Sequence, residues 1–252
     1  MQTSRQLRVE SAPGLLAITL ARPEKKNALT GAMYEALLQA FEHASLEASI
    51  RVVLLEAEGA DFCAGNDIAD FLAMARSRES LASSAAFRFL RMLASFDKPL
   101  VAAVRGRAVG IGTTMLLHCD LAYIAEDARL SAPFVDLALV PEAASSLLLP
   151  ARIGHARAFA MFALGETLDG REAVGHGLGN AALPADQVSA SARLAALTLA
   201  AKPAQALQAT KRLMREHGRL LAVIETESQA FIDRLMSPEA QAVFQAFMQR
   251  GR

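Results

Sequence analysis

Two glycine-containing loops carry the residues whose types and spacing most directly allow chemistry. The first is residues 59–67, GADFCAGND, and the second is residues 106–112, GRAVGIG. Glycine lets a backbone turn its N–H groups toward a ligand, and N–H groups exposed where a helix begins bind an anion or an oxyanion. On the pattern alone, tight strand-to-helix connections explain the two loops more simply. A dinucleotide fingerprint is excluded, because Gly106, Gly110 and Gly112 do not give the spacing G-x-G-x-x-G.

The other reactive side chains form no recognisable set. The five histidines are scattered without the spacing of metal ligands. Cys63 has no evident positioned base and is expected to pack, and Cys119 is expected to lie in the core. His118 ends an apolar segment and is expected to be structural or a helix cap. The sequence therefore predicts no metal site and no cysteine nucleophile.

The elements that must position the loops alternate between strands and helices in the first half of the chain. Residues 7–10 and 15–20 flank a Pro-Gly turn and predict a hairpin. Apolar runs predict buried strands, and apolar residues at helical spacing predict helices. The predicted strands are 51–56, 100–104 and 120–125, and the predicted helices are 31–48, 80–96, 113–118, 155–164, 171–176, 185–201, 203–216, 220–236 and 238–249. We expect an α/β core over 1–195 and a helical region over 196–252 that buries its apolar faces in subunit contacts.

The composition excludes several classes of protein. Lysine and arginine together number 26, and aspartate and glutamate together also number 26. The chain therefore has no net charge that would attract nucleic acid or an anionic membrane. Two cysteines are too few for a disulfide framework. No apolar run approaches the roughly 18–20 residues that span a bilayer, and residues 1–9 lack a secretory pattern. We expect a cytoplasmic protein with no nucleic-acid or membrane partner.

Taken together, the two loops and their surroundings resemble the crotonase superfamily, the enoyl-CoA hydratase and isomerase family. The segments that carry the resemblance are RP…NAL within 22–29, FCAGND at 62–67, KPLVAAVRGRAVGIG at 98–112 and CDLAY at 119–123. The resemblance implies an α/β fold, a repeated ββα superhelix followed by a C-terminal helical trimerisation region. It also implies a homotrimer or a hexamer built as a dimer of trimers, an acyl-CoA thioester as substrate and no separate cofactor.

The resemblance assigns an oxyanion hole to the two loops. A thioester makes its neighbouring C–H acidic, and the backbone N–H groups of Asn66 and Ile111 would stabilise the negative oxygen of the enolate. Isoleucine at 111 stands where glycine is usual and narrows the space; the side chain of Asn66 would add a donor or face solvent. The two glutamates with which hydratases activate water fall at Thr114 and Phe134, neither of which takes a proton from water at neutral pH.

A single glutamate offers a base. The segment PFVDLALVPEAASS at 133–146 looks like the peroxisomal-type Δ3,Δ2-enoyl-CoA isomerases, whose catalytic glutamate corresponds to Glu142. One carboxylate suffices for a 1,3-proton shift, and an apolar surround would raise its pKa. Two alternatives stay open: Glu142 as a first-turn glutamate that favours a helix dipole, and Asp136 as the base, although a surface position is expected for Asp136.

Further substrate contacts follow from the same resemblance. Lys25 lies in a loop expected near the CoA phosphates, and Ala64 would offer its carbonyl to the adenine. Phe231 and residues 244–252 are candidates to reach a neighbouring subunit's CoA. The predicted substrate-binding residues are Lys25, Ala28, Ala64, Gly65, Asp67, Ile68, Gly110, Thr114 and Phe134.

The leading expectation is isomerisation of a 3-enoyl-CoA to a 2-enoyl-CoA. Hydration of a 2-enoyl-CoA, or another thioester-enolate reaction, is the alternative within enzymes. A non-catalytic acyl-CoA-binding subunit is the alternative from another class, supported mainly by the isoleucine at position 111.

Overall fold

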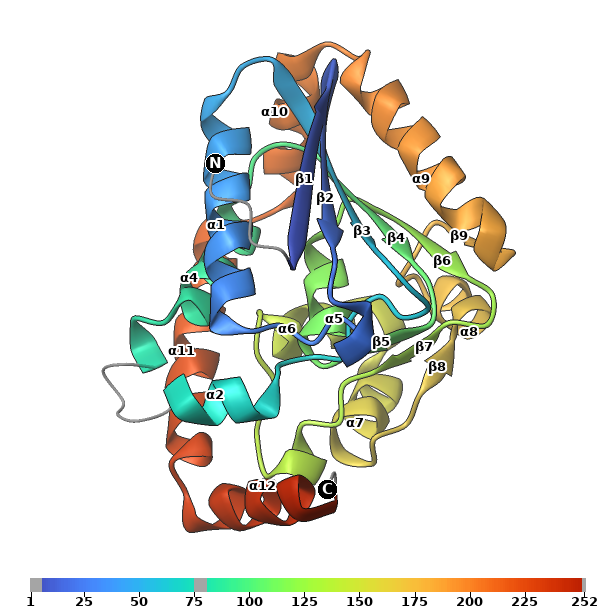
Figure 1. The fold of residues 1–252 in the computed structure, drawn as a ribbon. Coiled ribbons are helices and arrows are strands. Elements are labelled where there is room, and N and C mark those ends of the chain that lie inside the picture. The colour runs from blue at the N-terminus through green and yellow to red at the C-terminus, as the bar shows by residue number, and fades with distance from the viewer. Residues whose placement is uncertain (1–5, 75–80, 251–252) are drawn as a thin grey trace.

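A six-stranded sheet forms the centre of the computed structural model, which describes residues 6–74 and 81–250 (Figure 1). The strands lie in the order β1–β2–β3–β4–β6–β9. Only the first pair is antiparallel, as the predicted hairpin requires, and the later pairs are parallel. The strands are β1 (Leu7–Ala12), β2 (Gly14–Leu20), β3 (Ile50–Ala57), β4 (Leu100–Val104), β6 (Leu121–Ala125) and β9 (Ala181–Leu183).

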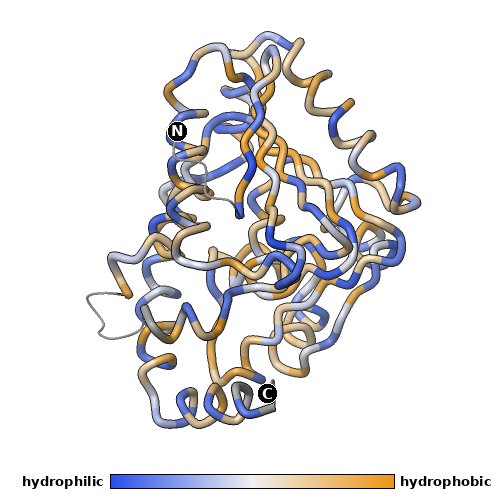
Figure 2. The backbone as a smooth tube through the Cα atoms, viewed as in Figure 1, coloured by the Kyte–Doolittle hydropathy of each residue, from blue (hydrophilic) through white to orange (hydrophobic). Residues whose placement is uncertain are grey.

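The strands β2, β3, β4 and β6 of this sheet are mostly apolar and buried, whereas β1 at the edge is largely exposed. All five residues of β4 are buried, and the hydropathy of the strands in Figure 2 is correspondingly high. A strand buried on both sides has a continuous apolar sequence rather than an alternating one. The predicted strands over 51–56, 100–104 and 120–125 are therefore confirmed in place, each within a residue of its predicted ends.

A second, smaller layer receives the chain after several strands of the main sheet. It contains a three-stranded sheet in the order β5–β7–β8, formed by Arg107–Val109, Arg129–Ser131 and Leu168–Asp169. Single parallel bridges join Leu29 to Asn66 and Cys63 to Ala108. Each repeat of the ββα superhelix thus places a long strand in the main sheet and a short extended segment in the second layer. These short segments span too few residues to show strand periodicity in the sequence.

Helices cover the main sheet on two sides. On one side, α1 (Gly31–Leu46) packs against α4 (Ala85–Ser95), and on the other α9 (Ala185–Ala200) lies on β3, β4 and β6 (Figure 1). The α1 helix begins where predicted, since the side chain of Thr30 accepts a hydrogen bond from the Met33 N–H at 3.2 Å. The predicted start of the second helix at residue 80 lies outside the described residues.

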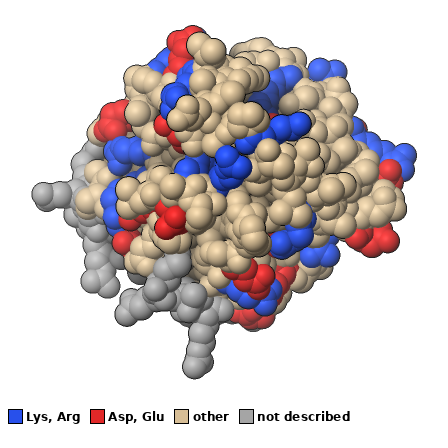
Figure 3. Space-filling model, turned by 90° about the horizontal axis from the view of Figure 1, so that it is seen from above, with Lys and Arg blue, Asp and Glu red and all other residues tan. Residues whose placement is uncertain are grey.

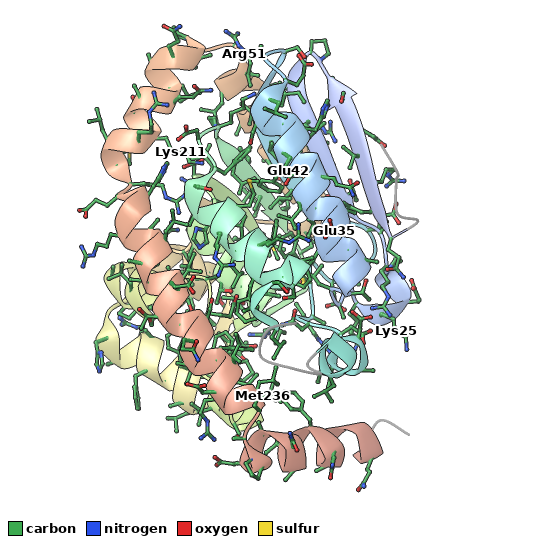
Figure 4. The ribbon with its side chains drawn as sticks, turned by 90° about the vertical axis from the view of Figure 1, so that its left-hand side faces the viewer. Lys25, Glu35, Glu42, Arg51, Lys211 and Met236 are labelled. Carbon is green, nitrogen blue, oxygen red and sulfur yellow. The ribbon has the colours of Figure 1, made fainter. Side chains whose placement is uncertain are left out.

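The helices near the C-terminus run down one side of the molecule. α11 packs against α4, and α12 lies across its end beyond Met236 (Figure 4). Buried Lys211 of α10 ties this region to the sheet, because its Nζ donates to Asp120 Oδ2 at 2.8 Å and to the Lys98 carbonyl at 2.7 Å. The remaining helices are α2 (Ile68–Met74), α5 (Ile111–Thr114), α6 (Ser145–Ile153), α7 (His155–Ala163), α8 (Gly170–Gly175), α10 (Ala204–Met214), α11 (His217–Leu235) and α12 (Pro238–Arg250).

Three local expectations differ from the structure. The helix predicted over 113–118 begins earlier, as α5, and continues as a tighter 3₁₀ helix over Met115–His118. The α6 helix was not predicted because Pro150 lies inside it. The predicted loop after residue 23 contains a 3₁₀ turn at Pro23–Lys25. The predicted division between residues 195 and 196 falls within α9.

The surface carries charges of both signs. On the face shown in Figure 3, basic and acidic side chains both occur, and basic side chains gather toward its centre. Within the described ranges, no helix combines the length and the apolar character needed to cross a membrane.

Candidate functional site

The two predicted loops lie directly against each other. The Cys63–Ala108 bridge joins them, and the Val109 N–H donates to the Cys63 carbonyl at 2.9 Å. Gly112 packs so closely on the first loop that a Cβ there would lie 2.4 Å from the Cys63 carbonyl oxygen. Glycine at 112 is therefore a packing requirement, and it brings the ends of both loops to one place.

The loop ends form one wall of a cavity of about 570 Å³. The facing wall comes from the segment after β7, from α11 and from α12. Seven predicted residues line this cavity: Ala64, Gly65, Asn66, Ile68, Gly110, Ile111 and Phe134. The sequence interpretation did not assign Val109, Pro133, Leu137, Leu139, Val243 and Ala246 to it.

Two residues that line this cavity, Asn66 and Ile111, have backbone N–H groups without a partner among the described residues. In the part of the chain that the structure describes, neither the Asn66 N–H nor the Ile111 N–H has a hydrogen-bond acceptor. Gly110 precedes the second donor with φ 54° and ψ −120°, a conformation that a residue with a Cβ rarely adopts. This geometry leaves two N–H groups available to an oxygen that carries negative charge.

A small chamber adjoins the large cavity. Its volume is about 20 Å³, close to the space of one water molecule. The chamber shares Asn66 and Phe231 with the large cavity. Its lining consists of Tyr34, Asn66, Ala86, Phe87, Leu90, Glu142 and Phe231, so Glu142 is the only carboxylate among the described residues that line it.

The Glu142 carboxyl group is buried and hydrogen-bonded. Its side chain belongs to a residue that is only 6% exposed, and the Thr114 hydroxyl donates to Oε1. Burial raises the pKa of Glu142 from 4.5 to about 8, against the Thr114 hydrogen bond that lowers it, and the charge of Glu227 raises it further. The predicted direction of the pKa shift is confirmed. The apolar side chains around the chamber come from α1, α4 and α11.

The structural alternative for Glu142 does not match its position. The α6 helix starts at Ser145, and the first-turn N–H of Ser146 points to Glu227 at 2.9 Å. The carboxyl group of Glu142 instead meets Thr114 on α5. Asp136 is exposed as expected, but it also lines the large cavity.

Tyr34 orients the side chain of Asn66. Its hydroxyl donates to Asn66 Oδ1 at 2.6 Å, and burial, followed by the charge of Glu142, raises the pKa of Tyr34 well above its usual value. The phenol therefore stays protonated and acts as a donor, which leaves the amide N–H groups of Asn66 free to face the cavities. The sequence interpretation did not identify Tyr34, because on the apolar face of α1 it cannot be told from a core aromatic residue.

Four predicted substrate-binding residues lie outside both cavities: Lys25, Ala28, Asp67 and Thr114. Asp67 pairs with Arg22 at 2.8 Å, and the Ala28 carbonyl accepts from the same guanidinium at 3.0 Å. Lys25 is exposed at the outer edge of the molecule, beyond the N-terminal end of α1 (Figure 4). Thr114, the remaining member of the predicted set, contacts Glu142 rather than the large cavity.

The candidate residues from the C-terminal region line this chain's own cavity. Phe231 borders both the large cavity and the small chamber, and Phe244 borders the large one. A contact between these residues and a neighbouring subunit's CoA stays a prediction.

The two cysteines and His118 are buried packing residues. Burial raises the pKa of Cys63 and of Cys119 to about 12, so neither thiol ionises near neutral pH. His118 is buried and its Nε2 lies 2.7 Å from the Ala143 carbonyl oxygen. Among the residues described, no group of three or more His, Cys, Asp or Glu side chains is arranged to hold a metal ion.

Comparison with known proteins places this architecture in one family. The sequence profile of the enoyl-CoA hydratase/isomerase family matches residues 10–252. The chain is 34% identical over 254 residues to enoyl-CoA delta isomerase 2 of Rattus norvegicus, covering 99% of this chain but 65% of the rat protein. It is 28% identical over 230 residues to a probable enoyl-CoA hydratase of Bacillus subtilis, covering 90% of this chain and 89% of that protein.

Solved structures agree with this relationship. OdaA of Pseudomonas aeruginosa superposes with a TM-score of 0.93 at 45% identity, covering 97% of this chain and 99% of that one. An enoyl-CoA hydratase/isomerase of Pseudoalteromonas atlantica gives a TM-score of 0.90 at 38% identity, with 97% of each chain covered. The chain belongs to the enoyl-CoA hydratase/isomerase family, the crotonase superfamily.

Proposed function

We propose that this enzyme moves the double bond of a 3-enoyl-CoA to position 2, with Glu142 as the only proton carrier. The observation that carries the proposal is the small chamber, in which Glu142 is the only carboxylate among the described lining residues and lies beside Asn66. The family resemblance puts the two hydratase glutamates at positions 114 and 134, which are threonine and phenylalanine in this chain. The relationship to enoyl-CoA delta isomerase 2 of rat supports the same reaction.

The large cavity takes the thioester in this proposal. The carbonyl oxygen of the substrate accepts hydrogen bonds from the N–H groups of Asn66 and Ile111, and the acyl carbons extend toward the small chamber. A buried, water-poor oxyanion hole stabilises developing charge more strongly than water does, because its donors are already oriented. The CoA thioester is the substrate, and the reaction uses no separate cofactor.

Proton transfer then proceeds in two balanced steps. The Glu142 carboxylate removes a proton from C2, and the electron pair of that C–H bond moves into a dienolate whose negative charge rests on the thioester oxygen. The protonated Glu142 returns the proton to C4, so the C3–C4 double bond becomes a C2–C3 double bond and the carbonyl re-forms. A pKa of about 8 suits both proton transfers, because the Glu142 carboxyl group must accept a proton and then donate it near neutral pH.

Hydration of a 2-enoyl-CoA is the second candidate. The chamber beside Glu142 has the volume of about one water molecule, and one carboxylate next to a water offers a general base. The relationship to a probable enoyl-CoA hydratase of Bacillus subtilis supports this reaction.

Parallel incubations with a 3-enoyl-CoA and a 2-enoyl-CoA distinguish the two reactions by the absorbance of the conjugated enoyl group. Isomerisation predicts that absorbance appears from the first substrate and that the second is consumed little. Glu142→Gln should lower kcat by at least about 100-fold while the protein still binds CoA esters. Asp136→Asn tests whether Asp136 rather than Glu142 is the base. A loss of kcat as large as that of Glu142→Gln would transfer this role to Asp136. Binding of both esters without turnover of either would favour a binding subunit.

The helical region over 196–252 is, in our proposal, an assembly region that forms a homotrimer or a hexamer. Leu213 and Met214 of α10 are 90% and 80% exposed in the single chain. Two adjacent exposed apolar side chains favour burial in a subunit interface. Light scattering on the purified protein should give three or six times the chain mass of 26.8 kDa, and a mass of one chain would refute the assembly.

A further inference from the structure

The turn that follows Glu142 has an unfavourable backbone. Ala143 has φ 61° and Ala144 has φ 54°, and both residues are buried. Two consecutive left-handed residues with a Cβ are uncommon, because the Cβ approaches the following carbonyl oxygen. Such a turn persists only where other groups hold it in place.

Glu227 of α11 holds this turn from the C-terminal helical region. Its Oε2 accepts the Ala144 N–H at 2.6 Å, and its Oε1 accepts the Ser146 N–H at 2.9 Å. Both carboxyl oxygens therefore act as acceptors, an arrangement that the ionised form satisfies fully. Glu227 is 7% exposed and lines neither cavity among the described residues.

A second contact fixes the other side of the turn. The His118 Nε2 donates to the Ala143 carbonyl at 2.7 Å, while Arg215 lies 3.0 Å from His118 Nδ1. Burial, followed by the charge of Arg215, lowers the pKa of His118 to about 3, so the ring is neutral. The turn is thus held between a neutral imidazole and a carboxyl group. Burial raises the pKa of Glu227, while the hydrogen bonds from Ser146 and Ala144 lower it and so favour its ionised form.

We propose that Glu227 is a positioning residue for Glu142, which holds the strained Ala143–Ala144 turn and places a second carboxyl group near the base. The inference rests on the proposed function of Glu142. It assigns to α11 a role in proton transfer, although Glu227 lines neither cavity.

The charge environment of Glu142 makes the electrostatic part testable. The groups that face it are Glu227 from α11, the Thr114 hydroxyl from α5, the Tyr34 phenol from α1 and the Cys63 thiol from the first loop. The phenol and the thiol remain neutral near pH 7 because their pKa values are raised. Removal of the Glu227 charge therefore lowers the pKa of Glu142, since it removes a like charge.

The principal test compares Glu227→Gln with a matched control on the same helix. Glutamine keeps the length of the side chain, but it has no charge and turns an amide toward one of two N–H donors. We expect kcat to fall about 10- to 100-fold through misplacement of the base, KM to change less than about threefold, and the ascending limb of the pH–rate profile to move to lower pH. Glu225→Gln, in which an exposed ion pair with Arg91 at 2.9 Å is lost, should leave all three unchanged.

Two further variants keep the test decisive if the turn fails to form. Glu227→Asp retains the charge but withdraws it from the turn, so kcat should fall while the pH limb stays near its wild-type position. Ala144→Gly in the Glu227→Gln background relieves the left-handed strain, and should restore kcat in part while the limb stays displaced. A folded Glu227→Gln protein with wild-type kcat and an unmoved limb would overturn the proposal. If neither Glu227→Gln nor its combination with Ala144→Gly folds, an unchanged kcat in Glu227→Asp would overturn the proposal.

A measurement that needs no turnover separates this inference from the proposed function. In protein labelled with ¹³C at glutamate carboxyl carbons, the signal that Glu142→Gln removes reports the titration of Glu142. A lower titration midpoint in Glu227→Gln than in the wild type, together with absent isomerase activity, would reject the proposed reaction and keep the charge coupling. A midpoint that does not move would reject the coupling, whatever the enzyme's activity.

Discussion

Glu142→Gln should stabilise the protein, and the gain should grow as pH rises. Glutamine matches the shape of glutamate and still accepts the hydrogen bond from Thr114, but it has no charge to bury. In the wild type, the native state keeps a proton on Glu142 that the unfolded chain releases. The pKa of Glu142 is about 8 in the folded protein, against 4.5 for a glutamate without folded surroundings. Between these two values the native state binds more protons, so wild-type stability falls as pH increases.

The magnitude follows from the difference between the two pKa values. Each unit corresponds to about 1.4 kcal/mol, so the contribution is near zero at pH 4, about 3 kcal/mol at pH 7 and at most about 5 kcal/mol at pH 9. The uncharged variant lacks this dependence. Its free energy of unfolding relative to the wild type should therefore rise by several kcal/mol from acid to alkaline pH.

Urea unfolding at pH values from 4 to 9 measures this difference. The pH dependence of the difference, rather than its absolute value, is the informative quantity, because the buried amide of glutamine has its own desolvation cost. Glu225→Gln is the control and should give a flat difference, since Glu225 lies on the surface. A flat difference for Glu142→Gln would refute the burial argument, and with it the raised pKa of the proposed base.

Three other perturbations test the surroundings of the base. The kcat/KM of the wild type should increase with pH through about 8 as Glu142 ionises. Thr114→Val should move this rise in kcat/KM to higher pH, because the hydroxyl group that favours the carboxylate is lost. A rise at the wild-type pH would contradict the role of this hydrogen bond. In Gly110→Ala the added Cβ meets no atom within 4 Å, but the residue must keep φ 54°. The free energy of unfolding should therefore fall by about 1–3 kcal/mol, and kcat should be lower than in the wild type. A wild-type kcat would show that the backbone angle is unimportant. Tyr34→Phe frees the Asn66 amide and should lower kcat about 3- to 10-fold, as for one lost hydrogen bond, with KM nearly unchanged; equal losses in kcat and affinity would indicate a general disturbance of the site.

Much of the architecture is readable from the sequence because burial leaves a pattern. The apolar run of β4 and the stripe of α1 follow from the two periodicities of strands and helices. The two glycine loops are visible because glycine is required where backbones approach closely, as Gly112 does at the Cys63 carbonyl. Their joint placement at one cavity required the family resemblance, since neither loop alone identifies a ligand.

The walls of the small chamber were not predictable in the same way. Tyr34, Phe87 and Phe231 come from three helices, α1, α4 and α11, and each has the spacing of an ordinary core residue. Their convergence depends on how the helices pack, which a single sequence does not encode in local patterns. The turn at Ala143 and Ala144 gives no signal either, because alanine is not a residue that marks a left-handed backbone.

The most direct test of a single proton carrier follows the proton itself. A 3-enoyl-CoA labelled with deuterium at C2 is converted in ordinary water, and the product is analysed by mass spectrometry and NMR for deuterium at C4. Because Glu142 lies in a chamber of about 20 Å³ and is 6% exposed, the account predicts that a measurable part of the label moves from C2 to C4 in the wild type and that Glu142→Gln forms no product. Wild-type product without deuterium at C4, or undiminished turnover in Glu142→Gln, would contradict it.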